Sequence, residues 1–540
     1  MKEIIPMRTY CMVFGYDGSD YHGMQIQLRD NKKVENLKTI EGEMEDCLKK
    51  LDLFFVGNDD NNDGGGFLKK IKWSRVGRTD KGVHSVCQVV SFRAKIRLNN
   101  ELEGILKHKN DSQKIKEICQ RLKIERDILN KNGLDESQNM NPLLGGVSLT
   151  PKSNVEDFLD ELLILDHIVG KLNELLETTK IMVFKIFRVT KNFDARTDCS
   201  RRQYEYLMPE FLLKPVNIIN EDFKEELIKA SLTRFEKGLN DLKSGSRKRK
   251  RSSCTNLNQS SESKEMKEEN LEIAEEMNEE EEEKEEKMKQ FEFHQANRLN
   301  NYGFGNDCKL VNYEIEDYLE EKRRFCLTDE DLKRFQTILN EYLGTNSFHN
   351  FTSKLSYDDS TSWRHIEEIK VVRVDPSEIK GDLKLIKIVI KGQSFLLHQI
   401  RKMVALAIEI FRGTAPSNAI QLCFLPDKYS IHLAPSQGLL LDRVFYNSYN
   451  TKRSISTDQN DFAIQFLSFH IQDCHFVKEM ESFKVNSIYS KISSTISEPN
   501  DNKWIEWIES ISRHPFIIDN LIYDTSYANK NKLENKDNQL

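Results

Sequence analysis

The chain has 540 residues, of which 38% are hydrophobic and 31% charged, and its formal net charge is −7. This length suffices for two or more hydrophobic cores, and no apolar run approaches the ~20 residues that cross a bilayer, so we expect a protein without a membrane span. Ten cysteines are scattered without a CxxC pair, which argues against a structural zinc site. The first residues, MKEIIPMRTY, lack the apolar region of a signal peptide, so we expect an intracellular protein.

The charge is unevenly distributed along the chain. Residues 261–290 hold 14 Glu and 5 Lys, so the remainder of the chain is slightly basic. A basic remainder is compatible with a nucleic-acid partner but does not require one.

The N-terminal region reads as alternating strands and helices. Residues 8–17 predict a strand that runs into a glycine-containing loop, and residues 39–51 predict a helix with one apolar face. That face comprises Ile40, Met44, Cys47, Leu48 and Leu51.

The stretch GRTDKGVHS, residues 77–85, lies between two apolar, strand-like runs. It places one carboxylate, Asp80, between Arg78 and Lys81. Taken alone, such an Asp more often forms a turn or an ion pair than acts as a nucleophile. The earlier stretch YDGSDYHGMQ, residues 16–25, likewise reads as a structural loop.

The middle of the chain adds a helix and two strands. Residues 156–176 predict a long helix, residues 181–189 predict a strand, and the stretch 192–209 includes a second strand. In the second strand Arg202, Tyr204 and Tyr206 share one face. A tyrosine there either fills the core or offers a ring for stacking and a hydroxyl for proton transfer.

Residues 243–290 interrupt this pattern with a basic run, a Ser/Asn tract and then the Glu-rich run. Like-charge blocks of this kind are expected to be disordered. The run Arg247 to Arg251 is either a solvated loop, an RNA-contacting tail or a nuclear-import signal. We therefore predict a nuclear protein, with the cytoplasm as a second location.

The C-terminal region resumes the ordered pattern. Residues 366–374 and 383–392 predict paired strands, and residues 394–413 predict a helix ending at Gly413. His398 and Arg401, three apart on that helix, should face the same way. Arg401 is either a snorkelling surface residue or the partner of a distant carboxylate.

The order of these elements predicts an α+β fold with helices on one face of an antiparallel sheet. An amphipathic helix with Trp504 and Trp507 is expected to pack against the back of the domain.

Five motifs occurring in order resemble the tRNA pseudouridine synthase A family. The resemblance covers residues 8–100, 155–225 and 330–512, and two motifs, FHNFT and GQSFLLHQIRKM, are similar to its eukaryotic branch that modifies several tRNA sites. The motifs are GRTDKGVHS (77–85), RRQYEYLMP (201–209), FHNFTSK (348–354), GQSFLLHQIRKM (392–403) and LAPSQGLLLDRV (433–444).

The resemblance implies a pseudouridine synthase fold, in which two α/β subdomains share a central, mostly antiparallel sheet with an RNA-binding cleft. It also implies that Asp80 is the nucleophile, and that a bidentate contact from Arg401 keeps it ionised and aimed. The tyrosine counterpart, Tyr204, stacks on the flipped base and is a candidate for proton transfer at C2′. The remaining residues expected to bind substrate are Arg78, Arg202, His398 and Leu439.

The reaction that the resemblance implies detaches uracil from C1′ of the ribose and rejoins it through C5, without metal or other cofactor. Its expected partner is tRNA in the anticodon stem-loop region, with messenger and small nuclear RNA as further candidates, and the chain is expected to be a monomer. Two alternatives stay open: a tRNA-binding chaperone without catalysis, and the sister branch specific for the end of the anticodon stem. That branch usually has Trp where Leu397 stands.

The predicted domain organisation follows from the motifs and the composition. An N-terminal catalytic part is split by one insertion and separated from the C-terminal catalytic part by another. The predicted segments are 8–108 (with Asp80), 109–154 (insertion), 155–235 (with the RxY strand), 236–300 (basic and acidic insertion), 301–450 (C-terminal catalytic subdomain), 451–515 (helical extension) and 516–540 (tail).

Overall fold

The structure is a computed structural model of the chain. It describes residues 4–29, 32–34, 37–56, 66–107, 153–215, 324–379, 383–455, 475–498 and 502–513, with Phe516 and Asn520. All of them belong to one compact unit, Met1–Leu239 with Arg323–Leu540, whereas the second unit, Asn240–Lys322, contains none. The predicted insertions 109–154 and 236–300 therefore lie almost entirely outside the described residues. No helix in the described part is long and apolar enough to cross a membrane.

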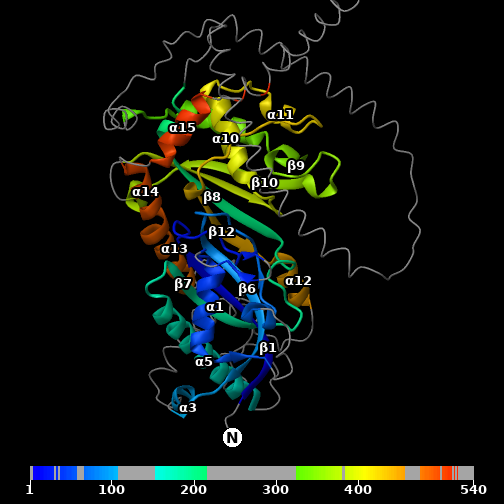
Figure 1. The fold of residues 1–540 in the computed structure, drawn as a ribbon, viewed down its shortest axis with the longest axis vertical. Helices are drawn as coiled ribbons and strands as arrows, with labels where there is room; N and C mark the ends of the chain where they lie inside the picture. Colours follow the sequence, from blue (N-terminus) through cyan, green and yellow to red (C-terminus); the bar gives the residue numbers. More distant parts are fainter. Residues whose placement is uncertain are drawn as a thin grey trace, which may run out of the picture. The chain divides into compact units, whose positions relative to one another are not determined.

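One large sheet joins the two halves of the chain (Figure 1). Its neighbouring strands are antiparallel except at one place, where β12 runs parallel to β6 through Leu440 and Leu441. The order is β7 (Ile181–Val189), β1 (Ile4–Tyr16), β6 (His84–Arg97), β12 (Leu439–Phe445), β8 (Arg201–Pro209), β11 (Leu385–Gly392), β10 (Trp363–Arg373) and β9 (Gly344–Ser347).

The short strands complete this picture. The strands β4 (Phe54–Phe55) and β5 (Ser74–Arg75) pair with β6, and β2 (Leu28–Arg29) pairs with β3 (Lys32–Lys33) in a separate ribbon. The predicted α+β class and the mostly antiparallel sheet are confirmed. Strand β8, from the first half of the chain, lies between β12 and β11 from the second half, so the sheet cannot be divided at one point of the sequence.

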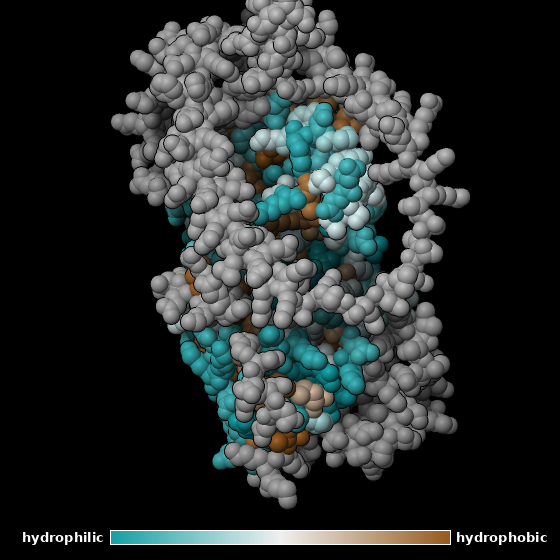
Figure 2. All heavy atoms as spheres, turned by 45° about the vertical axis from the view of Figure 1, so that its right-hand side comes forward, coloured by the Kyte–Doolittle hydropathy of each residue, from teal (hydrophilic) through white to brown (hydrophobic). Residues whose placement is uncertain are grey.

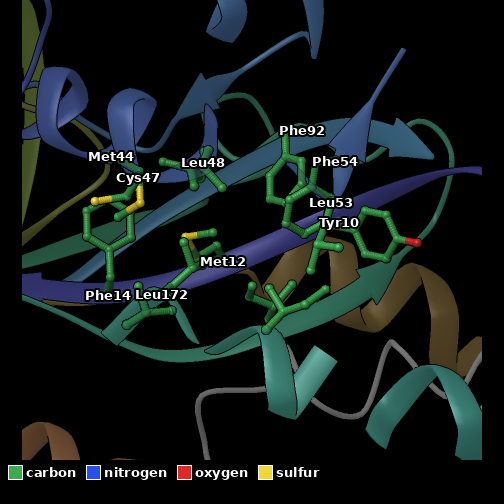
Figure 3. Close-up of a cluster of buried hydrophobic side chains, with 14 of the residues drawn as sticks. Tyr10, Met12, Phe14, Met44, Cys47, Leu48, Leu53, Phe54, Phe92 and Leu172 are labelled. Atoms are coloured by element: carbon green, nitrogen blue, oxygen red, sulfur yellow. The ribbon is translucent and has the colours of Figure 1, made fainter. Parts of the chain in front are cut away.

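The first core lies between β1 and two helices, α1 (Ile40–Leu51) and α5 (Ser153–Leu176). Figure 3 shows Met12 and Phe14 of β1 pointing toward Met44 and Leu48 of α1, with Leu172 of α5 beside them. Thr39 begins α1 by accepting a hydrogen bond from the Gly42 amide. The predicted apolar face is buried apart from Leu51, which is half-buried.

Helices also cover the opposite face of this part of the sheet, so the prediction of helices on one face is wrong. Phe184 and Phe187 of β7 pack edge-on against Phe483 and Phe476 of α13 (His475–Phe483). The α13 helix continues through a π-helical turn (Lys484–Tyr489) into α14 (Ser490–Ser497). Both faces of β1 and β7 are apolar, whereas a sheet covered on one face only would have polar residues on the other face. The prediction did not take this pattern into account.

The second core surrounds α10 (Gln399–Arg412), which packs against α9 (Asp329–Asn340). The predicted cap is confirmed, because Gly413 ends α10 in the left-handed conformation. Trp504 of α15 (Lys503–Arg513) is fully buried against Tyr206, as expected for a packing helix. The remaining helices are α2 (Phe67–Lys70), α3 (Asn100–Lys107), α11 (Ala419–Cys423) and α12 (Asn447–Ile455).

Hydrophilic residues cover most of the described surface on the face drawn in Figure 2, and hydrophobic residues form small separate areas there. The apolar side chains of these strands and helices thus lie mainly in the two cores.

Candidate active site

The loop that carries Asp80 is fixed from two sides. The hydroxyl groups of Thr79 and Tyr16 lie 2.8 Å apart, and the Gln88 amide donates to the Gly77 carbonyl at 3.1 Å. The Thr79 carbonyl also accepts from the Met24 amide at 3.1 Å. Residues at the end of β1 and on β6 therefore hold the loop, while the Asp80 side chain stays 23% exposed.

The stretch YDGSDYHGMQ supports this loop, as its structural interpretation predicted. A Cβ on Gly18 would lie only 2.0 Å from the Val83 carbonyl oxygen, so only glycine fits there. The buried His84 ring lies 3.1 Å from Asp17 Oδ1 and 3.1 Å from the Gln437 carbonyl. Burial alone would raise the pKa of Asp17, but hydrogen bonds from His84 and Ser19 lower it, so Asp17 is ionised.

Two side chains from the HQIRKM motif, distant in sequence, approach Asp80. Arg401 Nη1 lies 3.8 Å and His398 Nε2 3.6 Å from Asp80 Oδ2. Asp80 forms no ion pair with its sequence neighbours Arg78 and Lys81 among the described contacts. The predicted link between the two distant motifs is confirmed.

The contact between Arg401 and Asp80 is not the bidentate fork that was predicted. Nη1 makes the approach at 3.8 Å, which is longer than a hydrogen bond, while Nε donates to the Ala434 carbonyl at 2.6 Å. Burial, the main cause, lowers the pKa of the His398 imidazole below its ordinary value, although Asp80 opposes that shift. At neutral pH, Arg401 is therefore the cation beside Asp80.

The helix that carries these residues begins later than predicted. It starts at Gln399, and His398 precedes it as a cap in the left-handed conformation, with φ of 65°. His398 and Arg401 nevertheless reach the same carboxylate oxygen, because the turn before the helix redirects the His398 side chain.

Tyr204 lies across the pocket on β8 and is 8% exposed. Its ring packs edge-on against Phe395, with centroids 5.1 Å apart. The Tyr204 hydroxyl is close to the loop that carries Asp80, since a Cβ added to Gly77 would lie 3.7 Å from the hydroxyl oxygen. Burial chiefly raises the pKa of Tyr204 to about 12, and Arg202 partly opposes this, so the hydroxyl is protonated at neutral pH.

A pocket of about 600 Å³ brings most of the predicted residues together. Asp80, Tyr204, His398, Leu439, Arg78 and Arg202 all line it, whereas Arg401 contacts Asp80 without lining it. Asp80 is the single carboxylate among the lining residues. Five arginines line the pocket, namely Arg75, Arg78, Arg196, Arg202 and Arg364.

Arg202 ties several segments of the wall together. Its guanidinium donates to the Val76 carbonyl at 2.9 and 3.2 Å, to the Gln393 carbonyl at 2.9 Å and to the Arg196 carbonyl at 3.3 Å. These bonds use nitrogen atoms that a substrate would otherwise contact. These contacts give Arg202 a structural role. Substrate binding by Arg202 stays a prediction.

Sequence reasoning missed several residues of the pocket, among them Phe395, Arg196 and Arg364. Phe395 lies within a predicted motif, and its aromatic ring was a usable signal. The two arginines stand in stretches without a distinctive pattern. Leu397, which was noted only for its difference from the sister branch, is 55% exposed at the pocket.

Within the described ranges, no three His, Cys, Asp or Glu side chains are grouped as metal ligands would be.

Comparison with known proteins gives one family. A family model described as tRNA pseudouridine synthase matches residues 338–447, which include His398, Arg401 and Leu439. The chain is 30% identical over 501 residues to tRNA pseudouridine synthase 1 of Candida albicans, an alignment that covers 92% of this chain and 64% of that protein. The chain thus spans a little under two thirds of that relative.

Two further relatives carry related names. The tRNA pseudouridine synthase 2 of Schizosaccharomyces pombe is 26% identical, over 93% of this chain and 88% of the relative. The tRNA pseudouridine(27/28) synthase of Saccharomyces cerevisiae is 27% identical, over 82% and 85% respectively. The chain is thus similar to tRNA pseudouridine synthases, through a family model that matches part of it and through relatives aligned along most of its length.

Proposed function

We propose that this protein is a tRNA pseudouridine synthase that converts uridines of tRNA into pseudouridine. The observation that carries the proposal is the meeting of Asp80, Arg401 and Tyr204, from three distant motifs, at one arginine-lined pocket. A single carboxylate beside a fixed guanidinium suits a nucleophile that must stay ionised while partly desolvated.

In the proposed reaction an Asp80 oxygen attacks C1′ of the ribose, and N1 of uracil leaves with the bonding electrons. The uracil anion then turns so that C5 faces C1′. A C5–C1′ bond forms as the Asp80 carboxylate is displaced, and the proton on C5 moves to N1. The product is an isomer of the substrate, so no oxidant, energy source or co-substrate is consumed.

Tyr204 is proposed to stack on the uracil and to donate a proton or a hydrogen bond. Because its pKa is raised to about 12, the tyrosinate form is scarce at neutral pH, and the hydroxyl acts as a donor rather than a strong base. Leu439 and Phe395 add apolar surface beside the ring.

The uridine must leave the RNA stack to reach Asp80, which costs a few kcal/mol. Contacts between pocket arginines and RNA phosphates offset this cost. Arg78 is exposed and two residues from Asp80, so we assign it to the space that the extruded uridine vacates.

The eukaryotic multi-site branch is the favoured specificity, with target uridines in the anticodon stem-loop region and messenger or small nuclear RNA as further substrates. Leu397, in place of the Trp of the sister branch, is the observation that favours it. A monomer is proposed, since one chain supplies the whole pocket.

The decisive experiment incubates the purified protein and its Asp80→Asn variant with unmodified tRNA transcripts and maps pseudouridine. We expect product from the native protein and none from the variant, with tRNA binding retained by both. Lys81→Ala is the matched control, because Lys81 is exposed beside Asp80 and should not affect turnover. Binding without product from the native protein would favour the chaperone alternative.

We further propose that Arg247 to Arg251 direct the protein to the nucleus, a role that the clustering of five basic residues supports. Replacing all five with Ala in a fluorescent fusion should move the signal to the cytoplasm. An unchanged nuclear signal would refute this part of the proposal.

A further inference from the structure

Arg364 is a pocket arginine that makes no ion-pair contact with a carboxylate of the described residues, although Asp359 is near enough to oppose the lowering of its pKa by burial. It stands on β10, is half-buried, and lines the same pocket as Asp80. Its Nε atom is buried without a hydrogen-bond partner, and its Nη1 bonds only the carbonyl of neighbouring Trp363, at 2.7 Å. In the described part of the chain it forms no ion pair. Burying a guanidinium in this state is unfavourable unless a ligand satisfies it.

A second arginine, Arg196, stands near the same wall. Its side chain is exposed at the pocket, and its backbone carbonyl accepts from Arg202. Arg202 also bonds the Gln393 carbonyl, and the Gln393 amide bonds the carbonyl of His365, next to Arg364. Three hydrogen bonds therefore connect the backbone segments that carry Arg196 and Arg364.

Other pocket arginines are already engaged. Arg75 is paired with Glu41, and the guanidinium of Arg202 is used by backbone carbonyls. Arg78 flanks the nucleophile. Arg196 and Arg364 thus remain as cations at the pocket wall whose charge is not balanced by a paired carboxylate of the described residues.

We propose that Arg364 and Arg196 bind phosphate groups of the RNA strand next to the extruded uridine. The inference rests on the proposed function and deepens it by assigning a phosphate site to these two residues. A guanidinium presents parallel N–H donors that match two phosphate oxygens, and the orphan Nε of Arg364 would become one of these donors. The aromatic and apolar wall beside it suits a nucleotide better than an acidic peptide.

The site is tested by the salt dependence of tRNA binding. Each phosphate contact contributes about 0.7 to 0.9 to the slope of log affinity against log salt concentration. The variants R364Q and R196Q, made in an Asp80→Asn background so that no chemistry occurs, should each lower that slope by about one contact. In the active protein they should raise KM for tRNA more than they lower kcat.

Two matched variants separate charge from packing. R364K keeps the charge and should retain the slope while binding more weakly, since lysine contacts phosphate as a point charge. K370Q removes a cation from the same strand at a residue that is 65% exposed and does not line the pocket, so it should leave slope and KM unchanged. Melting temperatures of all variants should match the parent.

An unchanged slope and KM in both R364Q and R196Q would overturn the inference, even if turnover proves the enzyme active. Equal loss in R364K and R364Q with a lowered melting temperature would also overturn it, because the role would then be structural. A Glu-rich peptide, rather than tRNA, losing affinity in R364Q would identify a different ligand. Absence of pseudouridine from the native protein would instead refute the proposed function, and the slope comparison would still stand.

Discussion

Asp80 is the single carboxylate among the described residues that line the pocket, and it lies beside a guanidinium that is itself held by the backbone. Arg401 gives one nitrogen to Asp80 and another to the Ala434 carbonyl. The position of the charge is therefore set by a second contact that lysine, with a single nitrogen, cannot reproduce.

We expect Arg401→Lys to lower kcat/KM by roughly 10- to 100-fold, the range of a lost hydrogen bond from a charged donor, because lysine cannot face Asp80 and also donate to the Ala434 carbonyl. The affinity of the Asp80→Asn background for tRNA should not change, because Arg401 does not line the pocket. Single-turnover rates and binding isotherms measure the two effects. A loss confined to tRNA affinity would contradict the positioning role.

Tyr204 offers a cleaner separation of stability from chemistry. No hydrogen bond to its hydroxyl is recorded among the described residues, and its ring packs on Phe395. Tyr204→Phe should therefore leave the melting temperature unchanged while lowering the rate by about 100-fold or more, as for a lost proton donor. Because the pKa of Tyr204 is raised to about 12, the native rate should not fall through tyrosine ionisation below about pH 11.

The residues of the site were predicted unevenly from sequence, for a physical reason. Asp80 and Arg401 are more than 300 positions apart. Local patterns alone were also consistent with a turn Asp and a surface Arg, and only the ordered motifs linked the two residues. Arg364 could not be found this way. Its place in the pocket depends on the pairing of β10 with β9 and β11, which a single strand pattern does not specify.

At the scale of elements, the turn before β12 connects the parts of the site. The Ala434 carbonyl accepts from Arg401, the Pro435 carbonyl accepts from Tyr206 at 2.9 Å, and the Gln437 carbonyl lies beside His84. The turn thus contacts α10, β8 and the start of β6, which follows the Asp80 loop.

Gly438 allows this turn to approach β8, and Gly438→Ala should disturb it. The new Cβ would lie 2.5 Å from the Leu207 carbonyl oxygen and 2.7 Å from Trp504 Cη2, so the turn must move. We expect a loss of about 1–3 kcal/mol in the free energy of unfolding, as for overpacking, and a lower kcat.

Gly170→Ala is the control for that substitution. Gly170 lies in α5 with nothing within 4 Å of its added Cβ, so the change should stabilise the protein by about 0.5–1 kcal/mol. Urea unfolding and turnover of both variants test the contrast. Equal stability of the two would show that the turn tolerates a side chain.

Helices and strands with regularly spaced apolar residues were predicted well, while the residues at which they begin and end depended on local contacts. The strand predicted at 181–189 agrees with β7, and the strand predicted within 192–209 is β8. The helix of the HQIRKM motif was extended too far, because the apolar residues Phe395 to Leu397 continue the helical pattern although they line the pocket. An apolar residue facing a site and one facing the core give the same sequence signal.

At the scale of the molecule, the C-terminal helices are joined to the back of the catalytic strands through buried charge. Lys484, 5% exposed, contacts Asp442 of β12 at 2.9 Å and Glu205 of β8 at 3.4 Å. Tyr489 donates to Glu205 at 2.5 Å. Glu205 adjoins Tyr204 in sequence, so one strand presents the tyrosine to the site and the carboxylate to these helices.

Replacing Lys484 with Met should destabilise the whole protein, because it removes the buried cation shared by Asp442 and Glu205 and leaves them only the more exposed Arg443 and Lys387. Breaking a buried pair in this way costs about 3–5 kcal/mol. Arg443→Met is the control, since this residue is 47% exposed and contacts the same Asp442 from the surface. Its loss should stay near 1 kcal/mol or below, as for exposed pairs.

The deficit of Lys484→Met should depend on pH in a defined direction. Burial, followed by the charge of Asp442, raises the pKa of Glu205, and Lys484 opposes that rise. A carboxyl with a raised pKa binds its proton more readily in the folded state than in the unfolded state. The free energy of unfolding therefore falls as the pH rises from the pKa of the unfolded state to that of the folded state. Without Lys484 the pKa of Glu205 in the folded state rises further, so the variant should recover toward the native protein as the pH falls from neutral toward the ordinary pKa of a glutamate. Urea unfolding of both proteins across this range measures the difference, and a deficit independent of pH would show that Lys484 stabilises by packing rather than by charge.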